Sequence, residues 1–566
     1  MSVRHPAAPP LVPRVEEPLP SLQSNYGLLA WVSSVDHKQI GIMYLVTTLF
    51  FFLVGGVEAL LMRLQLAVPN NSTIGPDAYN QLFTMHGTTM VFLVIMPLLI
   101  GFSTYFAPLM IGANDMAFPR LNAMSYWLFL FGGLVLYFSL LATGMPDAGW
   151  FAYAPLNEWP FTSNPGMNYW GVGLAITGIG TIGAGINLMV TILTMRAPGM
   201  TLRRVPLFVW MTLINGVLII LAIPSLNSAI VMLLFDRLLN ANFFRVPMGG
   251  QPLLWQHAFW NFGHPEVYIM ILPAWGMISE VIPVFSRRPI FGYQFVAGAS
   301  AAIVVLSLIV WGHHMFVAGM GNTLNLAFGA TSLLIAVPTG IKVFNWTATT
   351  WGASIRFTTS MLFALAFIVQ FTIGGVTGVM FGAFPIDWQM EDSYFVVAHM
   401  HYVLFGGTAF AVWAGTYYWF PKITGKMLSE RLGKLNFLLA LIGFNLTFMP
   451  QHFLGYLGMS RRIYTYHAYP GWGELNLTSS IGAAILALSV LVFLWNMVHS
   501  LRHGADAGDN PWNAWTLEWA TSSPPPLHSF TRIPPIRSRR PLWDLAHPEN
   551  PDWRRREAQD GAADGD

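Results

Sequence analysis

The sequence has no cysteine among its 566 residues. This absence excludes disulfide bonds, thiolate-ligated haem, iron–sulfur clusters and haem attached through a C-x-x-C-H motif. Any redox metal that the chain binds must therefore be held by histidine, carboxylate or methionine side chains. Electrons for such a metal are expected to arrive from another polypeptide.

Charged residues are also scarce. They make up 10% of the chain, whereas hydrophobic residues make up 54%; a soluble globular protein has about 25% charged residues. This composition predicts an integral membrane protein that has the lipid bilayer as a partner. The net charge of +2 and the lack of a basic repeat give no indication of nucleic-acid binding.

Twelve stretches of the sequence are apolar enough to cross a membrane as helices, for which about 20 residues are needed. They are residues 40–62, 82–108, 123–143, 170–195, 207–235, 254–284, 292–315, 324–347, 358–381, 394–420, 435–457 and 474–500. We therefore expect an all-α membrane domain of twelve helices at 36–502. A polar, proline-rich segment precedes it at 1–35, and a polar, extended tail follows at 503–566. The tail contains SSPPP and RIPPIRSRRP, which cannot form a long helix.

Basic residues are distributed unequally between the two sets of loops. One set carries Arg120, Arg196, Arg203, Arg204, Arg287, Arg288, Arg356, Lys422, Lys426, Arg431 and Lys434, and the other carries Arg63, Arg237, Arg245, Arg461 and Arg462. Because cytoplasmic loops are enriched in lysine and arginine, both termini are predicted to be cytoplasmic.

One predicted span carries ionisable groups at its centre. The stretch 255–273, WQHAFWNFGHPEVYIMILP, contains His264, Glu266 and Tyr268. Such groups are costly within a membrane and are usually functional. On a helix His264 and Tyr268 share one face, whereas Glu266 lies roughly 200° away from both. A metal-ligand face and a proton-handling face on one helix indicate coupled electron and proton chemistry.

Six histidines fall in the outer half of the predicted membrane domain: His86, His264, His313, His314, His399 and His401. His399 and His401 are about 200° apart on a helix, so they can serve two metals but not one. His313 and His314 can turn toward one centre and, with His264, would suit copper or zinc. His86 remains as a partner for a haem iron.

The alternative interpretation of these histidines is a packing or hydrogen-bonding role, which a single membrane histidine often has. Six histidines at one depth, two in H-x-H and two in H-H, favour the ligand interpretation. His37 and His467, predicted in loops, and His452, which has no paired partner, are interpreted as structural or solvated.

Five motifs together resemble subunit I of the haem-copper terminal oxidases. They are GHPEVY (263–268), WGHHMF (311–316), VPTGIKVFNW (337–346), IGANDMAFPRLN (111–122) and VVAHMHYV (396–403). The resemblance covers about residues 36–540 and is nearest to the cytochrome c oxidase type with two proton channels. WNAWTLEWATSSPPPLHSF, in the tail, resembles the C-terminal extensions of some bacterial forms. The resemblance implies the twelve-helix bundle of that family.

The resemblance also implies cofactors and their ligands. His86 and His401 would be the axial ligands of a low-spin haem, and His399 the proximal ligand of a high-spin haem; both haems are expected to be haem A. His264, His313 and His314 would hold a copper. Tyr268 would be covalently joined to His264 and would supply an electron and a proton; without the motif, Tyr268 would be an ordinary core tyrosine.

The implied reaction is the four-electron reduction of O2 to water, coupled to proton translocation. The implied partners are a subunit II with a dicopper centre, subunit III, other small subunits and cytochrome c as electron donor. The expected location is the inner, or plasma, membrane of a bacterium.

Two proton routes follow from the same resemblance. Asp115, Asn122 and Asn187 would lead to Glu266. The second route, Ser279, Thr339 and Lys342, would lead to Tyr268. The simpler alternatives are a helix cap for Asp115 and a side chain that reaches the cytoplasmic surface for Lys342.

Near the outer surface, the resemblance assigns Arg461, Arg462 and Trp150 to the haem propionates. Loop solvation of the arginines and interfacial anchoring of the tryptophan are the alternatives. Glu391 and Asp392 stand where the family often has His-Asp beside a magnesium ion. Two carboxylates can bind a hard cation, so the resemblance adds magnesium to the expected cofactors.

Three other functions stay open. A quinol oxidase of the same superfamily differs mainly in its electron donor. A nitric oxide reductase shares the six-histidine pattern but is disfavoured by Glu266, Tyr268 and the Lys342 motif. A secondary transporter would suit twelve helices, but it gives no reason for the clustered histidines, and no inverted repeat is visible.

Overall fold

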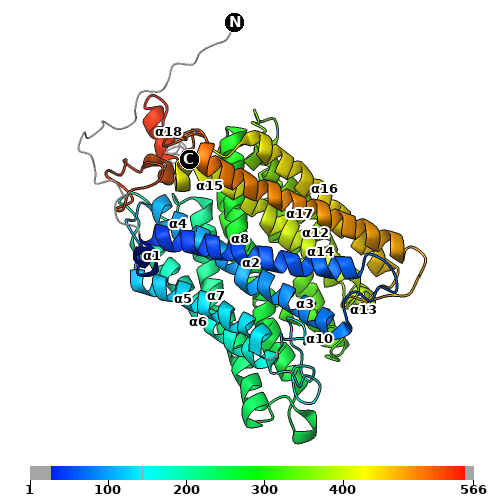
Figure 1. Cartoon of the computed structure of the whole chain (residues 1–566). Helices are drawn as coiled ribbons and strands as arrows, with labels where there is room; N and C mark the ends of the chain where they lie inside the picture. The colour runs from blue at the N-terminus through cyan, green and yellow to red at the C-terminus, as the bar shows by residue number, and fades with distance from the viewer. Residues whose placement is uncertain (1–26, 143, 553, 555–566) are drawn as a thin grey trace.

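The computed structural model describes residues 27–142, 144–552 and 554. Most of the predicted N-terminal segment 1–35 and the last part of the predicted tail lie outside these residues. The described chain is a bundle of long helices with no β-sheet among its described residues, only two isolated bridges (Figure 1).

The helices run along the chain as follows: α1 Leu28–Val32, α2 His37–Gln65, α3 Pro76–Thr88, α4 Met96–Ile111, α5 Pro119–Ala142, α6 Gly166–Thr194, α7 Leu207–Leu239, α8 Pro252–Ser286, α9 Tyr293–Ser307, α10 Asn322–Leu334, α11 Ala336–Thr350, α12 Thr359–Gly382, α13 Phe384–Met390, α14 Tyr394–Val403, α15 Phe410–Thr424, α16 Glu430–Tyr456, α17 Trp472–His503 and α18 Pro541–Ala546.

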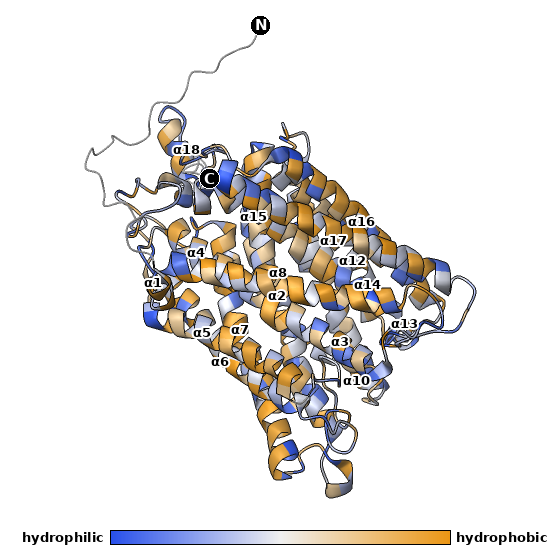
Figure 2. Ribbon diagram, in the orientation of Figure 1, coloured by the Kyte–Doolittle hydropathy of each residue, from blue (hydrophilic) through white to orange (hydrophobic). Residues whose placement is uncertain are grey.

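Hydrophobic residues predominate along the length of the helices, and hydrophilic residues are more frequent toward the ends of the bundle (Figure 2). Large apolar residues are exposed on these helices, among them Phe50, Phe295 and Leu491. In water such a surface would be unfavourable, whereas in a bilayer it faces lipid. The chain is therefore a multi-pass membrane protein.

Eleven helical segments in the described part of the chain are long and apolar enough to cross a membrane. They coincide with eleven of the twelve predicted spans. The predicted span 292–315 is different, because α9 ends at Ser307 and has 15 residues. The prediction placed His313 and His314 at the end of this helix, which is wrong. They lie in a separate 3₁₀ turn, Trp311–Met315.

Two of the long segments contain a π-helical turn. Thr89–Ile95 joins α3 to α4, and Leu404–Ala409 joins α14 to α15. Each turn begins three residues after a predicted haem ligand, His86 or His401. π-Helical turns within α-helices are rare and frequent at functional sites.

The C-terminal tail folds back onto one end of the bundle instead of extending away from it (Figure 1). Its longest described helix is the six-residue α18, in agreement with its prolines. Lys422 on α15 donates hydrogen bonds to the carbonyls of Asp509, Thr521 and Ser522 at 2.6–3.2 Å. These contacts fasten the tail to the helix that continues from α14.

Close approach of two backbones holds α16 against α17. A Cβ atom at Gly482 would lie 2.4 Å from the backbone nitrogen of Thr447, and one at Gly443 would lie 2.6 Å from that of Leu486. Both atoms belong to backbone and cannot move aside. Small residues at such crossings allow helices to pack closely in a membrane.

Gly482→Ala is therefore expected to destabilise the protein by on the order of 1–3 kcal/mol, because the added methyl group forces α16 and α17 apart. The measurement is the thermal unfolding midpoint of the purified protein in detergent. Gly375→Ala on α12 is the matched control, because a Cβ there meets nothing within 4 Å. Equal midpoints for the two variants would contradict the close-packing interpretation.

Candidate functional site

The site is built around α8, which is buried along most of its length and passes through the middle of the bundle (Figure 1). His264 and Tyr268 lie one turn apart on this helix, and their ring centroids are 4.9 Å apart. Glu266 between them is fully buried. The helix thus positions the imidazole and the phenol together, as the i, i+4 spacing predicts.

The structure brings His264, His313 and His314 together. One nitrogen of each lies within 4.8 Å of the others, and in the described chain this is the one group of three or more potential metal ligands at that separation. The 3₁₀ turn that carries His313 and His314 packs against α10, where a Cβ at Gly312 would lie 2.5 Å from the Phe328 ring. Only glycine allows this approach.

The hydrogen bonds of the three rings leave ring nitrogens available to bind a metal. The Ser332 hydroxyl donates to the Phe328 carbonyl, so it accepts from Nδ1–H of His313 at 2.7 Å. Within the described residues, both ring nitrogens of His264 and Nε2 of His314 have no hydrogen-bond partner. Three neutral imidazoles with free lone pairs and no thiolate fit copper or zinc.

His86 and His401 form a second arrangement. Their rings are nearly parallel, at 11°, with centroids 6.4 Å apart. His86 Nδ1 bonds to the Gly55 carbonyl at 2.9 Å, and His401 Nδ1 bonds to the Val397 carbonyl at 2.7 Å. Because a carbonyl only accepts, each Nδ1 carries the proton and each Nε2 keeps its lone pair. Two such facing rings fit the axial positions of a haem.

His399 faces a different helix from His401. Its Nδ1 lies 3.0 Å from the Gly374 carbonyl and 2.9 Å from the Thr377 hydroxyl, both on α12. This again places the proton on Nδ1 and leaves Nε2 free to bind a metal. The two histidines of the H-x-H motif therefore have separate surroundings, which two separate metals would need.

The first predicted proton route, from Asp115 through Asn122 and Asn187 to Glu266, contains buried polar side chains, and one of them, Asn187, is hydrogen-bonded. Both carboxylate oxygens of Glu266 and both amide atoms of Asn122 have no hydrogen-bond partner within the described protein. Asn187 differs, since its amide donates to the Phe118 carbonyl and accepts from the Phe118 amide, each at 2.9 Å. Asn187 thus holds the turn at 112–118 in place.

Asp115 lies in that turn, partly buried, and accepts a hydrogen bond from the Met116 amide at 2.7 Å. Burial raises the pKa of its carboxyl above the ordinary value, and the negative charge of Asp36 adds to this effect. The Met116 amide and the positive charge of Lys38 act in the opposite direction. A carboxyl with these surroundings binds a proton more readily than a solvated one.

The second predicted route contains a buried lysine. Lys342 on α11 is fully buried, and its ammonium group lies 3.6 Å from the centre of the Trp275 ring. Ser279 donates to the Trp275 carbonyl and accepts from Trp346 Nε1. Lys342 does not reach the surface, so the snorkelling alternative is wrong. Thr339 precedes Lys342 by about one turn of α11, and its hydroxyl donates to the Ile335 carbonyl.

The residues predicted to lie near the outer surface form an aromatic and charged group. Arg461 pairs with Asp392 at 2.5 Å, and the Arg462 guanidinium lies 4.9 Å from the centre of the Phe151 ring. Trp150 packs against Phe151, with ring centroids 4.6 Å apart. Burial raises the pKa of Glu391 to about 7, whereas the positive charge of Arg461 acts in the opposite direction.

Several residues near the site had no part in the sequence prediction. Ser332 and Thr377 orient His313 and His399, and nothing in their local sequence marks them. Asp387 lies one helical turn from Glu391, and burial and that neighbour raise its pKa to about 9; the i, i+4 spacing of the two acids was a usable signal. His37, predicted in a loop, is instead the buried first residue of α2.

Comparison with known proteins gives consistent results. Residues 39–485 match the family described as cytochrome c and quinol oxidase polypeptide I. The chain is 49% identical to cytochrome c oxidase subunit 1 of Bacillus subtilis, over 91% of this chain and 83% of that protein. It is 50% identical to a putative cytochrome c oxidase subunit 1-beta of Streptomyces coelicolor, over 92% and 91% of the two chains.

Quinol oxidase subunit 1 of Bacillus subtilis is also similar, with 48% identity over 90% of this chain and 79% of that protein. Among solved structures, a haem-copper terminal oxidase dimer has a TM-score of 0.69 at 18% identity, over 83% of this chain and 87% of that chain. That likeness concerns the fold. The family match spans most of the bundle and includes the six histidines predicted as metal ligands. The chain belongs to the cytochrome c and quinol oxidase polypeptide I family.

Proposed function

We propose that the chain is the catalytic subunit of a terminal respiratory oxidase, which reduces O2 to water with four electrons and moves protons across the membrane. The observation that carries this proposal is the cluster of His264, His313 and His314, with nitrogens within 4.8 Å of one another. The separate surroundings of His399 and of the His86–His401 pair support two further metals.

The residues present fit the cofactors of the family. His86 and His401 would hold a low-spin haem, His399 a high-spin haem, and the three-histidine cluster a copper; we propose haem A for both haems. The irons and the copper would deliver electrons and bind O2. The protein supplies neutral imidazoles of fixed tautomer, because the Nδ1 protons of His86, His313, His399 and His401 are engaged by carbonyl or hydroxyl oxygens.

Tyr268 is proposed to supply a proton and an electron at this site. Its ring lies 4.9 Å from that of His264, on the same face of α8. The bond between the two side chains that the family forms remains a prediction. The phenol is well placed for it, because both residues are held on one rigid helix.

Protons are proposed to reach the site by two routes. Asp115 receives them at the end of the bundle that carries the tail, and Asn122 lies on the way to Glu266. The unpartnered polar atoms of Asn122 and Glu266 support a hydrated path, since buried polar groups need partners and ordered water is the common one. Asn187 is proposed to position the turn, not to carry protons.

The second route would pass Ser279, Thr339 and Lys342 on its way to Tyr268. Lys342 is an unusual group for the interior, fully buried, with no hydrogen-bond partner in the described protein and only an aromatic ring over its ammonium group. A charge at such a position is expensive and is usually kept for a function.

Arg461, Arg462 and Trp150 are proposed to lie against haem propionates, for which paired guanidinium groups are suitable. A magnesium ion is proposed at Glu391 and Asp392. Asp392 is already paired with Arg461, so a cation would have to compete with the guanidinium.

The proposed topology has twelve crossings, with α9 and the turn after it as the shorter one, and both termini cytoplasmic. The membrane domain is 36–502, followed by the tail at 503–566. We propose a bacterial plasma membrane as the location. The proposed partners are subunit II with a dicopper centre, subunit III, small subunits and cytochrome c.

The test of the proposal is a reduced-minus-oxidised spectrum of the purified complex, with and without carbon monoxide, together with metal analysis. Two haems, only one of which binds carbon monoxide, and copper are expected. O2 consumption with reduced cytochrome c, compared with a quinol, then identifies the donor. A complex without haem would contradict the oxidase proposal and favour a transporter. Non-haem iron in place of copper would point to nitric oxide reduction.

His313→Ala is expected to abolish O2 reduction and to remove the copper of the three-histidine cluster, because two imidazoles cannot replace three. Both haem spectra should remain, since none of the three proposed haem ligands is altered. Copper per haem and O2 consumption are measured. His467→Ala in an outer loop, where the ring contacts Asn70, is the control and should resemble the unmodified protein. Retention of copper and activity in His313→Ala would exclude this ligand set.

Lys342→Met is expected to lower O2 consumption by roughly 100-fold or more, the range for loss of a positioned proton carrier. Methionine has a similar length and creates little cavity, so the variant should fold and retain both haem spectra. Lys434→Met, at an exposed position on α16, is the control. Unchanged turnover in Lys342→Met would mean that the buried lysine has only a packing role.

A further inference from the structure

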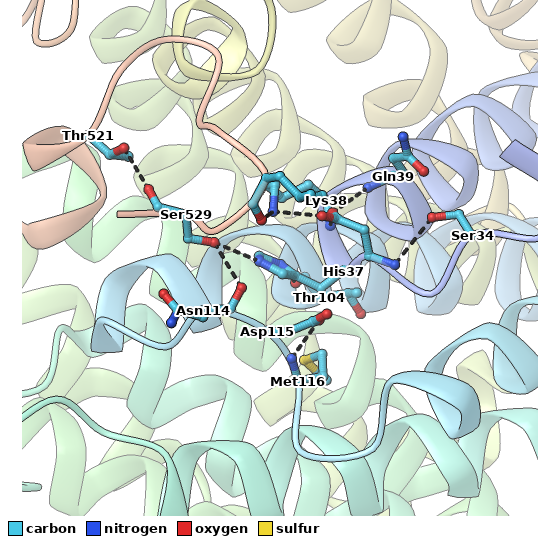
Figure 3. A network of polar contacts seen from close by, with 12 residues as sticks. Ser34, His37, Lys38, Gln39, Thr104, Asn114, Asp115, Met116, Thr521 and Ser529 are labelled. Carbon is cyan, nitrogen blue, oxygen red and sulfur yellow. Dashed lines mark hydrogen bonds and ion pairs between the residues drawn. The ribbon is translucent and has the colours of Figure 1, made fainter. Parts of the chain in front are cut away.

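The C-terminal tail reaches the turn that carries Asp115. Residues 521–530 lie beside this turn and the first residues of α2, with Ser529 between Asn114 and His37 (Figure 3). Ser529 is fully buried although its neighbours Leu527 and His528 are exposed. The tail therefore enters the protein at Ser529 and the buried Phe530 that follows it.

The Ser529 hydroxyl joins two elements that are distant in sequence. It donates to the Asn114 carbonyl at 3.0 Å and lies 3.3 Å from His37 Nε2. His37 Nδ1 lies 2.9 Å from the Thr104 carbonyl, an acceptor, so it carries the ring proton. In the neutral ring Nε2 is then an acceptor. The Ser529 hydroxyl therefore has two acceptors within reach, the Asn114 carbonyl in the turn and His37 Nε2 on α2.

The tail also engages the charges that surround Asp115. The Lys38 ammonium donates to the Leu527 carbonyl at 3.0 Å and to the Asp36 carboxylate at 2.9 Å. Asp36 raises the pKa of Asp115, and Lys38 lowers it. The Leu527 carbonyl therefore helps to fix the cation whose position acts on Asp115.

The conformation of Ser529 is held by its surroundings. Its φ is +58°, in the left-handed region that non-glycine residues rarely adopt. The Thr521 hydroxyl donates to the Ser529 carbonyl at 2.6 Å, and Lys422 holds the Thr521 carbonyl. Strain of this kind persists where the neighbouring structure imposes it and is frequent at functional sites.

We propose that Ser529 is a positioning residue for proton uptake at Asp115, and that residues 521–530 form one wall of the mouth of this route. The proposal rests on the proposed oxidase function and on the role of Asp115 in it. Ser529 does not carry protons to the haem-copper site. Its hydroxyl holds the turn at Asn114 against α2 and keeps water from surrounding the neighbouring carboxyl.

The consequence for Asp115 has a definite sign. Burial is the main reason that its pKa is raised. Loss of the Ser529 hydroxyl would loosen the turn, admit water and lower this pKa toward its ordinary value. The charged groups that act on Asp115 are Asp36 and Lys38, and His37 lies beside Ser529. From the tail, the Ser529 hydroxyl and the Leu527 carbonyl contact these elements, and the exposed His528 is the titratable tail residue next to Ser529. A smaller protonated fraction would then slow proton uptake first at alkaline pH.

The experiment uses the whole oxidase complex with Ser529→Ala and Ser529→Gly, and measures O2 consumption against pH. Both variants should lower kcat at alkaline pH by roughly twofold to fivefold, the loss expected for one hydrogen bond. The alkaline limb of the profile should move to lower pH. The KM for the electron donor and the haem spectra should not change, because neither depends on the mouth.

Two comparisons separate the hydroxyl from other effects. Glycine adopts a φ of +58° without strain, so a defect in Ser529→Ala alone would assign the effect to backbone strain and overturn the proposal. Ser522→Ala is the matched control, since that exposed hydroxyl bonds only to the nearby Pro524 carbonyl. An equal defect there would also overturn it, as would loss of the haems in both Ser529 variants.

Failure of this inference is distinguishable from failure of the oxidase proposal. If the unmodified complex contains the haems and consumes O2, while both Ser529 variants retain its pH profile, only the role of Ser529 is refuted. If the unmodified complex has no haem, the proposed function itself fails.

Discussion

The site depends on one constraint, which is that buried imidazoles must keep a lone pair available inside an apolar bundle. A neutral imidazole has one N–H and one lone pair, and its tautomer decides which atom can bind a metal. Oxygens on other helices accept the Nδ1 protons: Gly55 on α2 for His86, Ser332 on α10 for His313, and Gly374 and Thr377 on α12 for His399. Packing of the helices therefore sets the chemistry of the ligands.

Burial in an apolar bundle also determines the state of the other ionisable groups of the interior. Glu266 and Lys342 are fully buried, and neither has a hydrogen-bond partner within the described protein. Burial without a partner disfavours the charged forms of both side chains. An apolar bundle would gain stability from leucine or methionine at these positions, so folding does not explain these two residues. The proposed proton routes give both of them a role.

Much of the fold could be predicted because hydrophobic runs and histidine spacing are local signals. The H-x-H pair and the His264–Tyr268 pair follow from helix geometry alone. The end of α9 at Ser307 was not predictable in this way, because the residues after it remain apolar and the 3₁₀ turn depends on contact between Gly312 and Phe328. Ser332 and Thr377 could not be found either, since their roles exist only once distant helices are packed.

The tail is the clearest case of structure that local patterns do not reveal. Its composition predicts an extended segment, and its described part contains no long helix. Yet Ser529 contacts His37, which is 492 residues earlier in the chain, and Asn114, which is 415 residues earlier. The helices that carry His37 and Thr104 are made first and the tail last. The surroundings of Asp115 are thus completed only when the end of the chain has docked, which couples the mouth of the proposed proton route to complete folding.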